Sequence, residues 1–419
     1  MSFNTISVVG LGYIGLPTAS MIASCKINVI GIDIDKSTVD TINKGNIHIN
    51  EPGLNNLVSS MVKDGYLRAS YTPEPADVFI LSVPTPFDTK NKEPDLSYIK
   101  TASKSLGPVL KSGDLVILES TSPVGTTEKM AIWLAESRPD LSFPQTLGED
   151  SDIRIAYCPE RILPGNALHE LIKNDRVIGG LTNKCSNLAS KLYKNFVVGD
   201  CIITNARTAE MAKLTENSFR DTNIAFANEL SIICDKLNIN VWELISISNR
   251  HPRVNILNPG PGVGGHCIAV DPWFIVSSAP NESRLIQIAR EVNDSKPNWV
   301  IEKIRTGIGE YLIDNPEKSL SDVCVACYGI TFKPDIDDLR ESPALKIVME
   351  LSKFHKGKTL VVDPNIQQLP DECLGIELVE FNDAIELATL HVLLVDHKLF
   401  YTKDMSSKKI IDTKGIWIR

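Results

Sequence analysis

The chain has 419 residues, of which 43% are hydrophobic and 23% charged, and its formal net charge is −9. This length is long for one hydrophobic core, so we expect two or three domains. The negative charge argues against nucleic acid or an anionic membrane surface as a partner, and no apolar run is long enough to span a membrane. Nine scattered cysteines and an N-terminus without a basic start argue against disulfides and secretion, and favour a cytoplasmic protein.

The first 35 residues predict a dinucleotide-binding turn. The apolar strand "TISVVG" runs into Gly10, Gly12 and Gly15, and a second strand, "INVIGID", ends at Asp33. Gly10 permits the tight turn, Gly12 lets backbone N–H groups reach a pyrophosphate, and Gly15 lets the next helix pack closely. Asp33 would accept hydrogen bonds from the adenosine ribose and repel a 2′-phosphate, so NAD is favoured over NADP. The residues expected to contact the cofactor here are Gly10, Gly12, Tyr13, Ile14, Gly15 and Asp33.

Polar residues follow the next three predicted strands. These strands lie in "DVFILSVPTP", "DLVILESTSPVGTTEKM" and "IRIAYCPER", within an alternating α/β pattern. Ligands of such sheets bind beyond the carboxyl ends of the strands, so the polar ends should meet at one crevice. Each residue taken alone is better explained as a loop hydroxyl or a solvated charge, but the group favours a site. Its members are Thr85, Thr121, Thr126, Glu160 and Arg161.

Residues 204–236 predict one long helix, because they contain neither proline nor glycine and many good helix formers. Lys213, Asn217 and Arg220 are spaced at i, i+4 and i+7 and share a face of that helix. A solvated stripe would explain them, but the asparagine and the absence of a matching carboxylate favour a face turned to a ligand.

A single cysteine lies in the glycine-rich loop "PGPGVGGHCIAVDP", residues 259–272. Glycine runs cost backbone entropy, so the loop indicates either an unusual backbone path or the close approach of a ligand. The alternative is a tight turn whose cysteine belongs to the core.

A second α/β unit is predicted beyond residue 300. Its strands lie in "DVCVACYGITFKPD", "KTLVVDP", "LHVLLVD" and "KKIIDTKG", with a helix in "SPALKIVMELSKF". Cys324 and Cys327 resemble half of a zinc site, but no second pair exists, so they are read as core residues and no metal is expected. Aromatic and basic residues at strand ends suit a second nucleotide, the handle of the substrate. They are Phe332, Lys333, Arg340 and Lys414.

Together these segments resemble the UDP-glucose/GDP-mannose dehydrogenase family. The resemblance runs from "GLGYIGLP" through "STSPVG", "YCPER", "EMAKLTENSFRDTNIAFANEL" and "GGHC" to "FKPDIDDLRESP". It implies an α/β fold of two Rossmann-like doubly wound domains, joined by a long central helix and a helical dimerisation region. The expected parts are an NAD-binding domain (1–203), a central region with the cysteine loop (204–300) and a UDP-sugar-binding domain (301–419).

The resemblance also implies a reaction: NAD-dependent, four-electron oxidation of a nucleotide sugar at C6. Within the family, the cysteine loop is most similar to that of members acting on UDP-N-acetyl-D-mannosamine, because His266 and Val270 replace the serine and lysine usual in UDP-glucose enzymes. The product would be the uronate, made with two NAD and one water for bacterial surface polysaccharides such as enterobacterial common antigen. Cys267 would hold the aldehyde as a thiohemiacetal and then a thioester.

The family's functional positions carry over residue by residue. Lys213 would stabilise the C6 oxyanion, Asn217 would bind the same oxygen, and Asp271 would accept a proton through a water. Glu160 and Thr121 would position and activate the hydrolytic water. The glycines near Cys267 are expected to leave room for the sugar and nicotinamide. Thr85, Thr126 and Arg340 would approach NAD. The remaining substrate contacts are expected from Arg161, Ile162, Arg220, His251, Arg253, Gly264, Phe332, Lys333 and Lys414.

Other interpretations stay open at this stage. UDP-N-acetylglucosamine is the nearest alternative sugar, and a two-electron dehydrogenase of the hydroxy-acid type or a non-catalytic NAD-binding regulator would share the first domain. Apolar residues on the long helix, including Phe219 and Phe226, predict a homodimer through that helix. By resemblance, Arg253 would reach into the site of the neighbouring subunit.

Overall fold

The computed structural model describes residues 3–88, 93–163, 165–265 and 267–417. The chain forms two compact units, one made of Met1–Glu216 and Trp273–Pro280, the other of Asn217–Pro272 and Asn281–Arg419. Two helices continue from one unit into the other along the chain, α9 (Ala206–Leu237) and α11 (Asp271–Ser278).

The first unit contains an eight-stranded sheet in the order β10-β9-β8-β7-β4-β1-β2-β3. All neighbouring strands are parallel except β8 and β9, so β9 and β10 run against the other six. The predicted strands of this region are confirmed. The strands are β1 (Thr5–Val9), β2 (Asn28–Ile32), β3 (Leu67–Ser70), β4 (Val78–Leu81), β7 (Leu115–Leu118), β8 (Arg154–Tyr157), β9 (Arg176–Gly180) and β10 (Cys201–Asn205).

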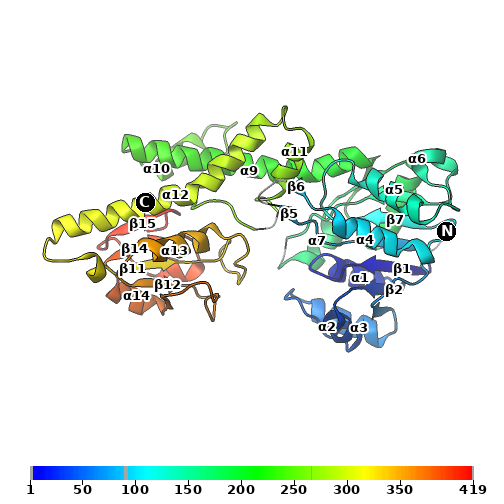
Figure 1. Ribbon diagram of the computed structural model, residues 1–419, viewed down its shortest axis with the longest axis horizontal. Helices are drawn as coiled ribbons and strands as arrows, with labels where there is room; N and C mark the ends of the chain where they lie inside the picture. Colours follow the sequence, from blue (N-terminus) through cyan, green and yellow to red (C-terminus); the bar gives the residue numbers. More distant parts are fainter. Residues whose placement is uncertain (1–2, 89–92, 164, 266, 418–419) are drawn as a thin grey trace. The chain divides into compact units, whose positions relative to one another are not determined.

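Helices cover both faces of this sheet, as expected for a doubly wound fold. Two apolar cores result: one lies under α1, α2, α3 and α8, and the other under α4 and α5. In Figure 1, α2 and α3 lie below β1 and β2, and α4 and α5 lie above them. The helices are α1 (Gly15–Ser24), α2 (Lys36–Asn43), α3 (Leu54–Lys63), α4 (Ser97–Ser105), α5 (Thr126–Ser137), α6 (Pro144–Leu147), α7 (Ala167–Lys173) and α8 (Asn183–Tyr193). A small ribbon of β5 (Phe87–Asp88) and β6 (Glu93–Pro94) completes the unit.

The second unit contains a five-stranded sheet in the order β13-β12-β11-β14-β15, parallel throughout. Helices α12 and α13 pack on one face and α14 on the other (Figure 1). The elements are α10 (Val241–Ser248), α12 (Arg284–Asp314), β11 (Val325–Tyr328), α13 (Pro343–Phe354), β12 (Thr359–Val362), β13 (Ile376–Leu378), α14 (Phe381–Leu387), β14 (Leu390–Leu393) and β15 (Ile410–Asp412).

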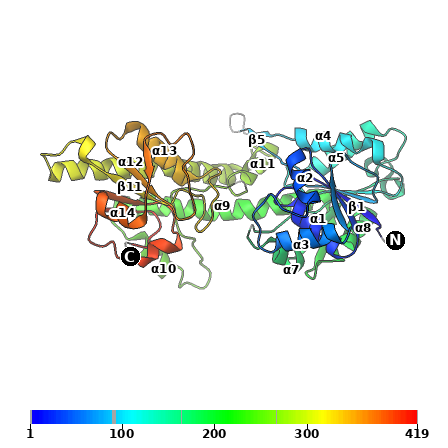
Figure 2. The ribbon, with the colours of Figure 1, turned by 90° about the horizontal axis from the view of Figure 1, so that it is seen from below.

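The long central helix is present as predicted, since α9 is continuous over 32 residues (Figure 2). The expected domain boundaries do not fall in linkers: residue 203 lies within β10, and residue 300 lies within α12. The sequence patterns did not predict α12, a helix of 31 residues that contains Pro297.

Cys327 is buried within β11, whereas Cys324 lies just before the strand, is half-buried and packs toward the core on the other face. The two cysteines therefore lie on opposite faces of the sheet, and only Cys327 is a full core residue. Over the described residues, none of the helices is both long and apolar enough to cross a membrane.

Candidate functional site

The glycine-rich turn after β1 has the geometry that a dinucleotide needs. Gly10 has φ +91°, and a Cβ there would lie 2.6 Å from the carbonyl oxygen of Ser82. A Cβ on Gly15 would overlap the Gly10 carbonyl, whereas nothing lies within 4 Å of a Cβ built on Gly12. The first and third glycines thus form the turn and the helix contact, and the second leaves an open cradle at the helix N-terminus.

Asp33 lies beside this turn at the carboxyl end of β2. Its Oδ2 accepts a hydrogen bond from the amide of Leu11 at 2.9 Å, and its Oδ1 accepts one from the amide of Asp35 at 3.0 Å. Tyr13 is 43% exposed and Ile14 is half-buried. The exposed cradle and the fixed carboxylate fit a dinucleotide with a free ribose, as the sequence predicts.

The structure brings Thr85, Thr121 and Glu160 to one edge of the first sheet, because they follow the adjacent strands β4, β7 and β8. The Thr85 hydroxyl donates to the Thr121 carbonyl at 2.6 Å, which ties the two loops together. Thr126 differs: its side chain is buried and donates to the Pro123 carbonyl at 2.7 Å. It closes the first turn of α5, so its hydroxyl is not presented to a ligand.

Glu210, which sequence reasoning missed, holds this edge from α9. Its carboxylate accepts hydrogen bonds from the amides of Gly125 and Thr127 at 2.6 and 2.8 Å and from the Thr127 hydroxyl at 2.6 Å. An acid at a helix N-terminus satisfies amides that the helix leaves unpaired. The signal was its position three residues before Lys213 on the same helix.

Glu160 is 6% exposed, and its carboxylate lies 2.6 Å from the guanidinium of Arg176, which is 1% exposed. Arg161, the next residue, turns elsewhere and forms an ion pair with Glu216 at 2.7 Å. Arg176 also went unrecognised in the sequence, although it opens the apolar run of β9. Ile162 is half-buried in the loop that follows.

In the second unit, Asn217 on α9 donates to Oδ2 of Asp271 at 2.6 Å, and both side chains are buried. Lys213 lies one turn earlier on the same face of the helix, is half-buried and forms no ion pair within the described part of the chain. Arg220 is exposed. The predicted face of α9 therefore carries a lysine and an amide, and the amide fixes a buried carboxylate.

Cys267 is exposed at the end of the glycine-rich loop. Its carbonyl accepts the amides of Val270 and Asp271 at 3.1 and 2.9 Å, so a single turn separates the thiol from the buried aspartate. The other predicted difference in this loop, His266, lies outside the described residues.

The glycines of this loop have a role that the sequence did not predict. A Cβ on Gly264 or Gly265 would come within 2.9 Å of Phe332, and Gly265 has φ +82°. A Cβ on Gly262 would come within 2.9 Å of Pro343. These three glycines are therefore required where the cysteine loop packs against the segment after β11, which explains their absence of side chains without reference to a sugar.

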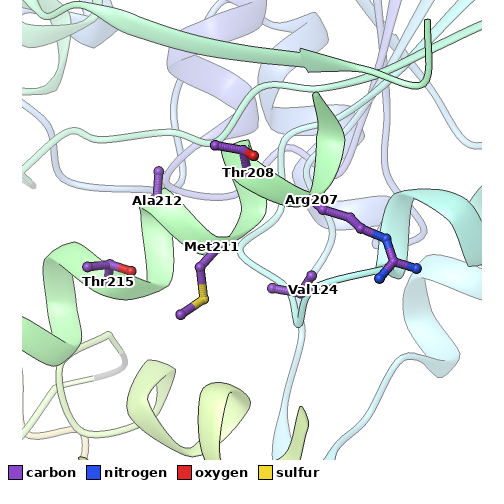
Figure 3. A pocket seen from close by; sticks show the side chains of 6 residues that line it. All are labelled: Val124, Arg207, Thr208, Met211, Ala212 and Thr215. Carbon is purple, nitrogen blue, oxygen red and sulfur yellow. The ribbon is translucent and has the colours of Figure 1, made fainter. Parts of the chain in front are cut away.

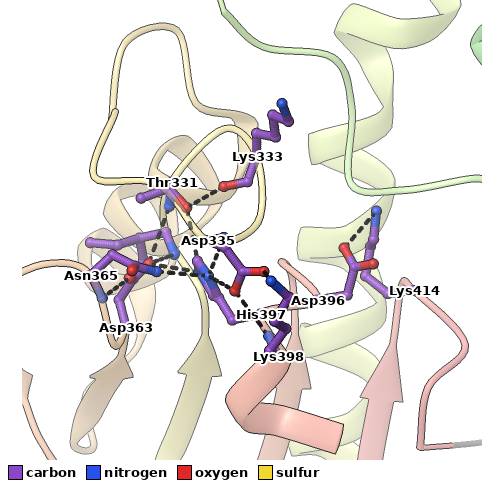
Figure 4. A network of polar contacts seen from close by, with 10 residues as sticks. Thr331, Lys333, Asp335, Asp363, Asn365, Asp396, His397, Lys398 and Lys414 are labelled. Atoms are coloured by element: carbon purple, nitrogen blue, oxygen red, sulfur yellow. Dashed lines mark hydrogen bonds and ion pairs between the residues drawn. The ribbon is translucent and has the colours of Figure 1, made fainter. Parts of the chain in front are cut away.

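A buried network lies at the carboxyl ends of β11, β12 and β14 (Figure 4). Asp363 accepts hydrogen bonds from the Ile330 amide at 2.8 Å and from His397 Nε2 at 3.2 Å. His397 Nδ1 accepts the amide of Asp335 at 3.0 Å, so Nε2 carries the proton. The network anchors the loop that carries Phe332, next in the chain after buried Thr331.

The predicted basic residues of this unit differ in their contacts. Figure 4 shows the Lys333 amine directed away from it, and the Lys414 amine lies 3.1 Å from Asp396 Oδ1. Arg340 is exposed and pairs with Asp338 at 2.6 Å. His251 and Arg253 lie in the exposed segment after α10, where the Arg253 amide donates to the His251 ring at 3.3 Å.

Comparison with known proteins agrees with the interpretation of the first sheet as a dinucleotide-binding unit and of the second as a nucleotide-binding unit. The sequence matches three domains of the UDP-glucose/GDP-mannose dehydrogenase family: the NAD binding domain over residues 4–197, the central domain over 207–295 and the UDP binding domain over 326–419. It is 59% identical to UDP-N-acetyl-D-mannosamine dehydrogenase of Yersinia pestis over the full length of both chains.

Two further relatives mark the range of the likeness. NDP-N-acetyl-D-galactosaminuronic acid dehydrogenase of Ralstonia nicotianae is 58% identical, over all of this chain and 97% of that protein. The solved UDP-D-ManNAc dehydrogenase of Pyrococcus horikoshii is 38% identical and superimposes with a TM-score of 0.85, covering 98% of this chain and 96% of that one. The chain therefore belongs to the UDP-glucose/GDP-mannose dehydrogenase family and is an NAD-dependent nucleotide-sugar dehydrogenase.

Proposed function

We propose that this enzyme oxidises UDP-N-acetyl-D-mannosamine at C6 to UDP-N-acetyl-D-mannosaminuronate, in two successive oxidations. The observation that carries this proposal is the exposed thiol of Cys267, one turn from Asp271, which Asn217 holds on the face of α9 that also bears Lys213. A nucleophile, a cation and a buried carboxylate are what such a reaction requires. The names of the relatives from Yersinia pestis and Pyrococcus horikoshii support the choice of sugar.

In the first oxidation the C6 hydroxyl loses its proton toward Asp271 through a water, and Lys213 stabilises the oxyanion. The glycine-rich turn of Gly10, Gly12 and Gly15 would hold NAD, which would supply the hydride acceptor for each oxidation. Asn217 binds the same oxygen and keeps it in place. The aldehyde then reacts with the thiolate of Cys267, which prevents its escape.

The second oxidation converts the thiohemiacetal on Cys267 into a thioester. Thr121 and Glu160 position a water, which attacks the acyl carbon while Glu160 takes its proton, and Cys267 leaves as the thiolate. One sugar and one water are consumed, two hydrides are transferred, and the carboxylate is released.

A nucleotide-sugar panel with the hydride count tests this proposal. The panel contains UDP-N-acetyl-D-mannosamine, UDP-N-acetylglucosamine, UDP-N-acetylgalactosamine and UDP-glucose, and NADH is measured against substrate consumed. We expect the mannosamine derivative to give the highest kcat/KM, with two NADH for each sugar. A count of one would favour a two-electron dehydrogenase, and NAD binding without turnover would favour a regulator. The galactosamine arm is included because the Ralstonia relative is named for that sugar.

Cys267→Ser tests the covalent chemistry. An alkoxide is harder to form than a thiolate, so formation of the uronate should fall by a factor on the order of 10² or more, while NAD binding is retained. Cys201→Ser, a half-buried cysteine of the first unit, serves as the matched control and should keep full activity. Uronate production by the Cys267 variant at the rate of that control would contradict the assignment.

We further propose a homodimer through α9. Phe219, Phe226 and Ile233 recur every seven residues along the helix and are 69%, 52% and 46% exposed. A shallow pocket of about 650 Å³ continues this face at the start of the helix, with Val124, Met211 and Ala212 among its lining residues (Figure 3). Such an apolar stripe is covered when two copies of a helix pack across a two-fold axis.

Mixed dimers test whether sites are shared. If Arg253 serves the neighbouring subunit, the Arg253→Ala and Cys267→Ala homodimers should both lose almost all activity. A purified heterodimer of the two variants contains one intact site, so about half of the wild-type activity should return. A verified heterodimer without activity would show that each chain uses its own arginine.

We also propose that the enzyme acts in the cytosol and supplies a uronic acid precursor for bacterial surface polysaccharides such as enterobacterial common antigen. The number and scatter of the cysteines favour a reducing compartment. A deletion strain that still assembled polymer containing mannosaminuronate would contradict this role.

A further inference from the structure

A group of buried ionisable side chains lies around Glu160 in the first unit. We call it the buried charge cluster; its members are Glu119, Cys158, Glu160, Arg176 and Tyr193. The Nη1 atom of Arg176 lies 2.6 Å from Oε2 of Glu160 and 3.9 Å from Oε1 of Glu119. Its guanidinium also lies over the Tyr193 ring, 5.1 Å from the centroid. One cation is therefore shared by two carboxyl groups that are almost fully removed from water.

The reversed strand β9 brings Arg176 to this position. Strands β8 and β9 are antiparallel, with Tyr157 opposite Gly179. Continuing this register beyond the end of β8 places Glu160 opposite Arg176, the first residue of β9. In a fully parallel sheet the first residue of a strand would lie at the far edge. The arginine thus comes from a strand of the sheet and not from a mobile loop.

The charges of the cluster are unequal. Burial raises the pKa of Glu119 to about 7, and the neighbouring Glu160 adds to that rise. The distances agree with this inequality, because Arg176 lies 2.6 Å from Glu160 but 3.9 Å from Glu119, so Glu160 is its main partner. Apolar residues would stabilise the fold as well as a buried ion pair does, so the cluster is poorly explained as a stabilising element.

Both oxygens of Glu160 are held. Oε1 accepts the amide of Arg161 at 2.7 Å, and Oε2 is in contact with Arg176. The contact with Arg176 is close but not aligned as a hydrogen bond, and within the described residues neither Nη atom of Arg176 has a hydrogen-bond partner. The guanidinium therefore acts on Glu160 mainly through its charge.

We propose that Arg176 is a positioning residue for hydrolysis of the thioester: it fixes the orientation of the Glu160 carboxylate and places a positive charge beside it. This inference rests on the proposed function, in which Glu160 takes a proton from the attacking water. In that step the water oxygen bonds to the acyl carbon, the proton passes to Glu160, and the C–S bond breaks to release the Cys267 thiolate. Arg176 makes and breaks no bond; it holds the proton acceptor in place.

Arg176→Lys is the first test, because it keeps the charge but shortens the reach. The variant is mixed with NAD and UDP-N-acetyl-D-mannosamine, quenched during turnover, and the mass of the Cys267 peptide is measured. We expect the acyl adduct to accumulate and steady-state NADH production to fall about 10-fold or more, after a burst of two NADH for each site. A residue that only supports the fold would lower stability without accumulation of adduct.

Glu160→Gln and Asp114→Asn are the comparison variants. Glu160→Gln should accumulate the same adduct, because it removes the proton acceptor itself. Asp114 is also buried but lies at the amino end of β7, so its variant should lose stability and show no adduct. If Arg176→Lys does not fold, Arg176→Lys in a Glu119→Gln background, compared with Glu119→Gln alone, carries the same test with one carboxylate fewer.

The outcomes separate the inference from the proposed function. Adduct in Glu160→Gln but not in folded Arg176→Lys would overturn the role of Arg176 alone. Absence of adduct in Glu160→Gln would overturn the role of Glu160, and the inference with it. Adduct in both variants, and none in Asp114→Asn, would support the inference.

Discussion

Both sheets have buried carboxyl groups just beyond the carboxyl ends of their parallel strands, but with opposite electrostatic results. In the first unit, two carboxyl groups share Arg176, and burial raises the pKa of Glu119 to about 7. In the second unit, burial alone would raise the pKa of Asp363, but hydrogen bonds from His397 and a backbone amide lower it below its ordinary value.

The difference lies in the satisfaction of polar atoms. Asp363 is surrounded by donors: the Ile330 amide, the Asn365 amide and His397 Nε2 all point at its oxygens. The two Nη atoms of Arg176 have close contacts but no aligned hydrogen bond within the described residues. A buried network whose polar atoms all have hydrogen-bond partners makes the local structure rigid. A buried charge without such partners costs stability, which favours a functional role for it. We therefore interpret the second network as a support for the nucleotide loop and the first as part of the chemistry.

The largest effect is expected from Asp363→Asn, which removes the carboxylate at the centre of the hydrogen-bonded network in the second unit. The new amide group would face donors from the backbone or from His397, so the free energy of unfolding should fall by about 2–4 kcal/mol. The KM for the UDP-sugar should rise more than kcat falls, because the loop of Phe332 and Lys333 loses its anchor. Urea unfolding and steady-state kinetics measure both effects.

Asp335→Asn is the matched control for that variant. Asp335 belongs to the same network but its side chain is 38% exposed, and an asparagine can still accept the amide of Lys398. Its cost should stay below about 0.5 kcal/mol. Equal losses in the two variants would show that hydrogen bonding to the buried oxygen is not what holds the loop.

Glu119→Gln tests the raised pKa in the buried charge cluster of the first unit, because the effect of the substitution on stability should depend on pH. The pKa of Glu119 in the folded protein, about 7, lies above its ordinary value of 4.5, so the folded protein keeps a proton that the unfolded chain releases. This contribution to stability is full at low pH and is lost as pH rises through 7. Between pH 5 and pH 8, the free energy of unfolding of the wild type should therefore fall by about 1–3 kcal/mol relative to that of the glutamine variant. If the difference in unfolding free energy between the variant and the wild type were the same at pH 5 and pH 8, the raised pKa of Glu119 would be contradicted.

Apart from the control, Lys296→Met should give the smallest effect on stability. Its pH dependence has the opposite sign to that of Glu119→Gln. Lys296 is 2% exposed in the second unit, lies 3.7 Å from the centre of the Trp299 ring, and burial lowers its pKa to about 7. The unfolded chain holds a proton between pH 7 and 10.5 that the folded protein lacks, so wild-type stability rises with pH over that range. The methionine variant should be more stable by about 1 kcal/mol at pH 6, and this advantage should shrink by pH 9. An advantage that grew with pH would be inconsistent with burial of the charge.

The parts of the fold that depend on local sequence could be predicted. Gly10, Gly12 and Gly15 define a turn within six residues, and the apolar strands and α9 follow from local composition. Helix α12 escaped prediction because its buried face includes Arg290, Asn293 and Lys296, which makes it read as polar.

Site residues could be placed together from the sequence where one segment carries them, or where they follow the predicted parallel strands β4, β7 and β8. Cys267 and Asp271 are separated by one turn of chain, and Lys213 and Asn217 by one turn of helix. The contact of Glu160 with Arg176 depends on the reversal of β9, and that of Asp363 with His397 on strands that are neighbours only in the folded sheet. Such contacts leave no spacing in the sequence for a pattern to detect.

The packing of Gly264 and Gly265 on Phe332 has a consequence for substrate length. No side chain separates the loop that carries the thiol from the loop expected to hold the uridine, and both belong to the second unit. If Phe332 contacts the base, the close packing of the two loops would keep the distance from base to thiol constant. We therefore expect the enzyme to discriminate between nucleotide sugars by the length of the linker between base and sugar.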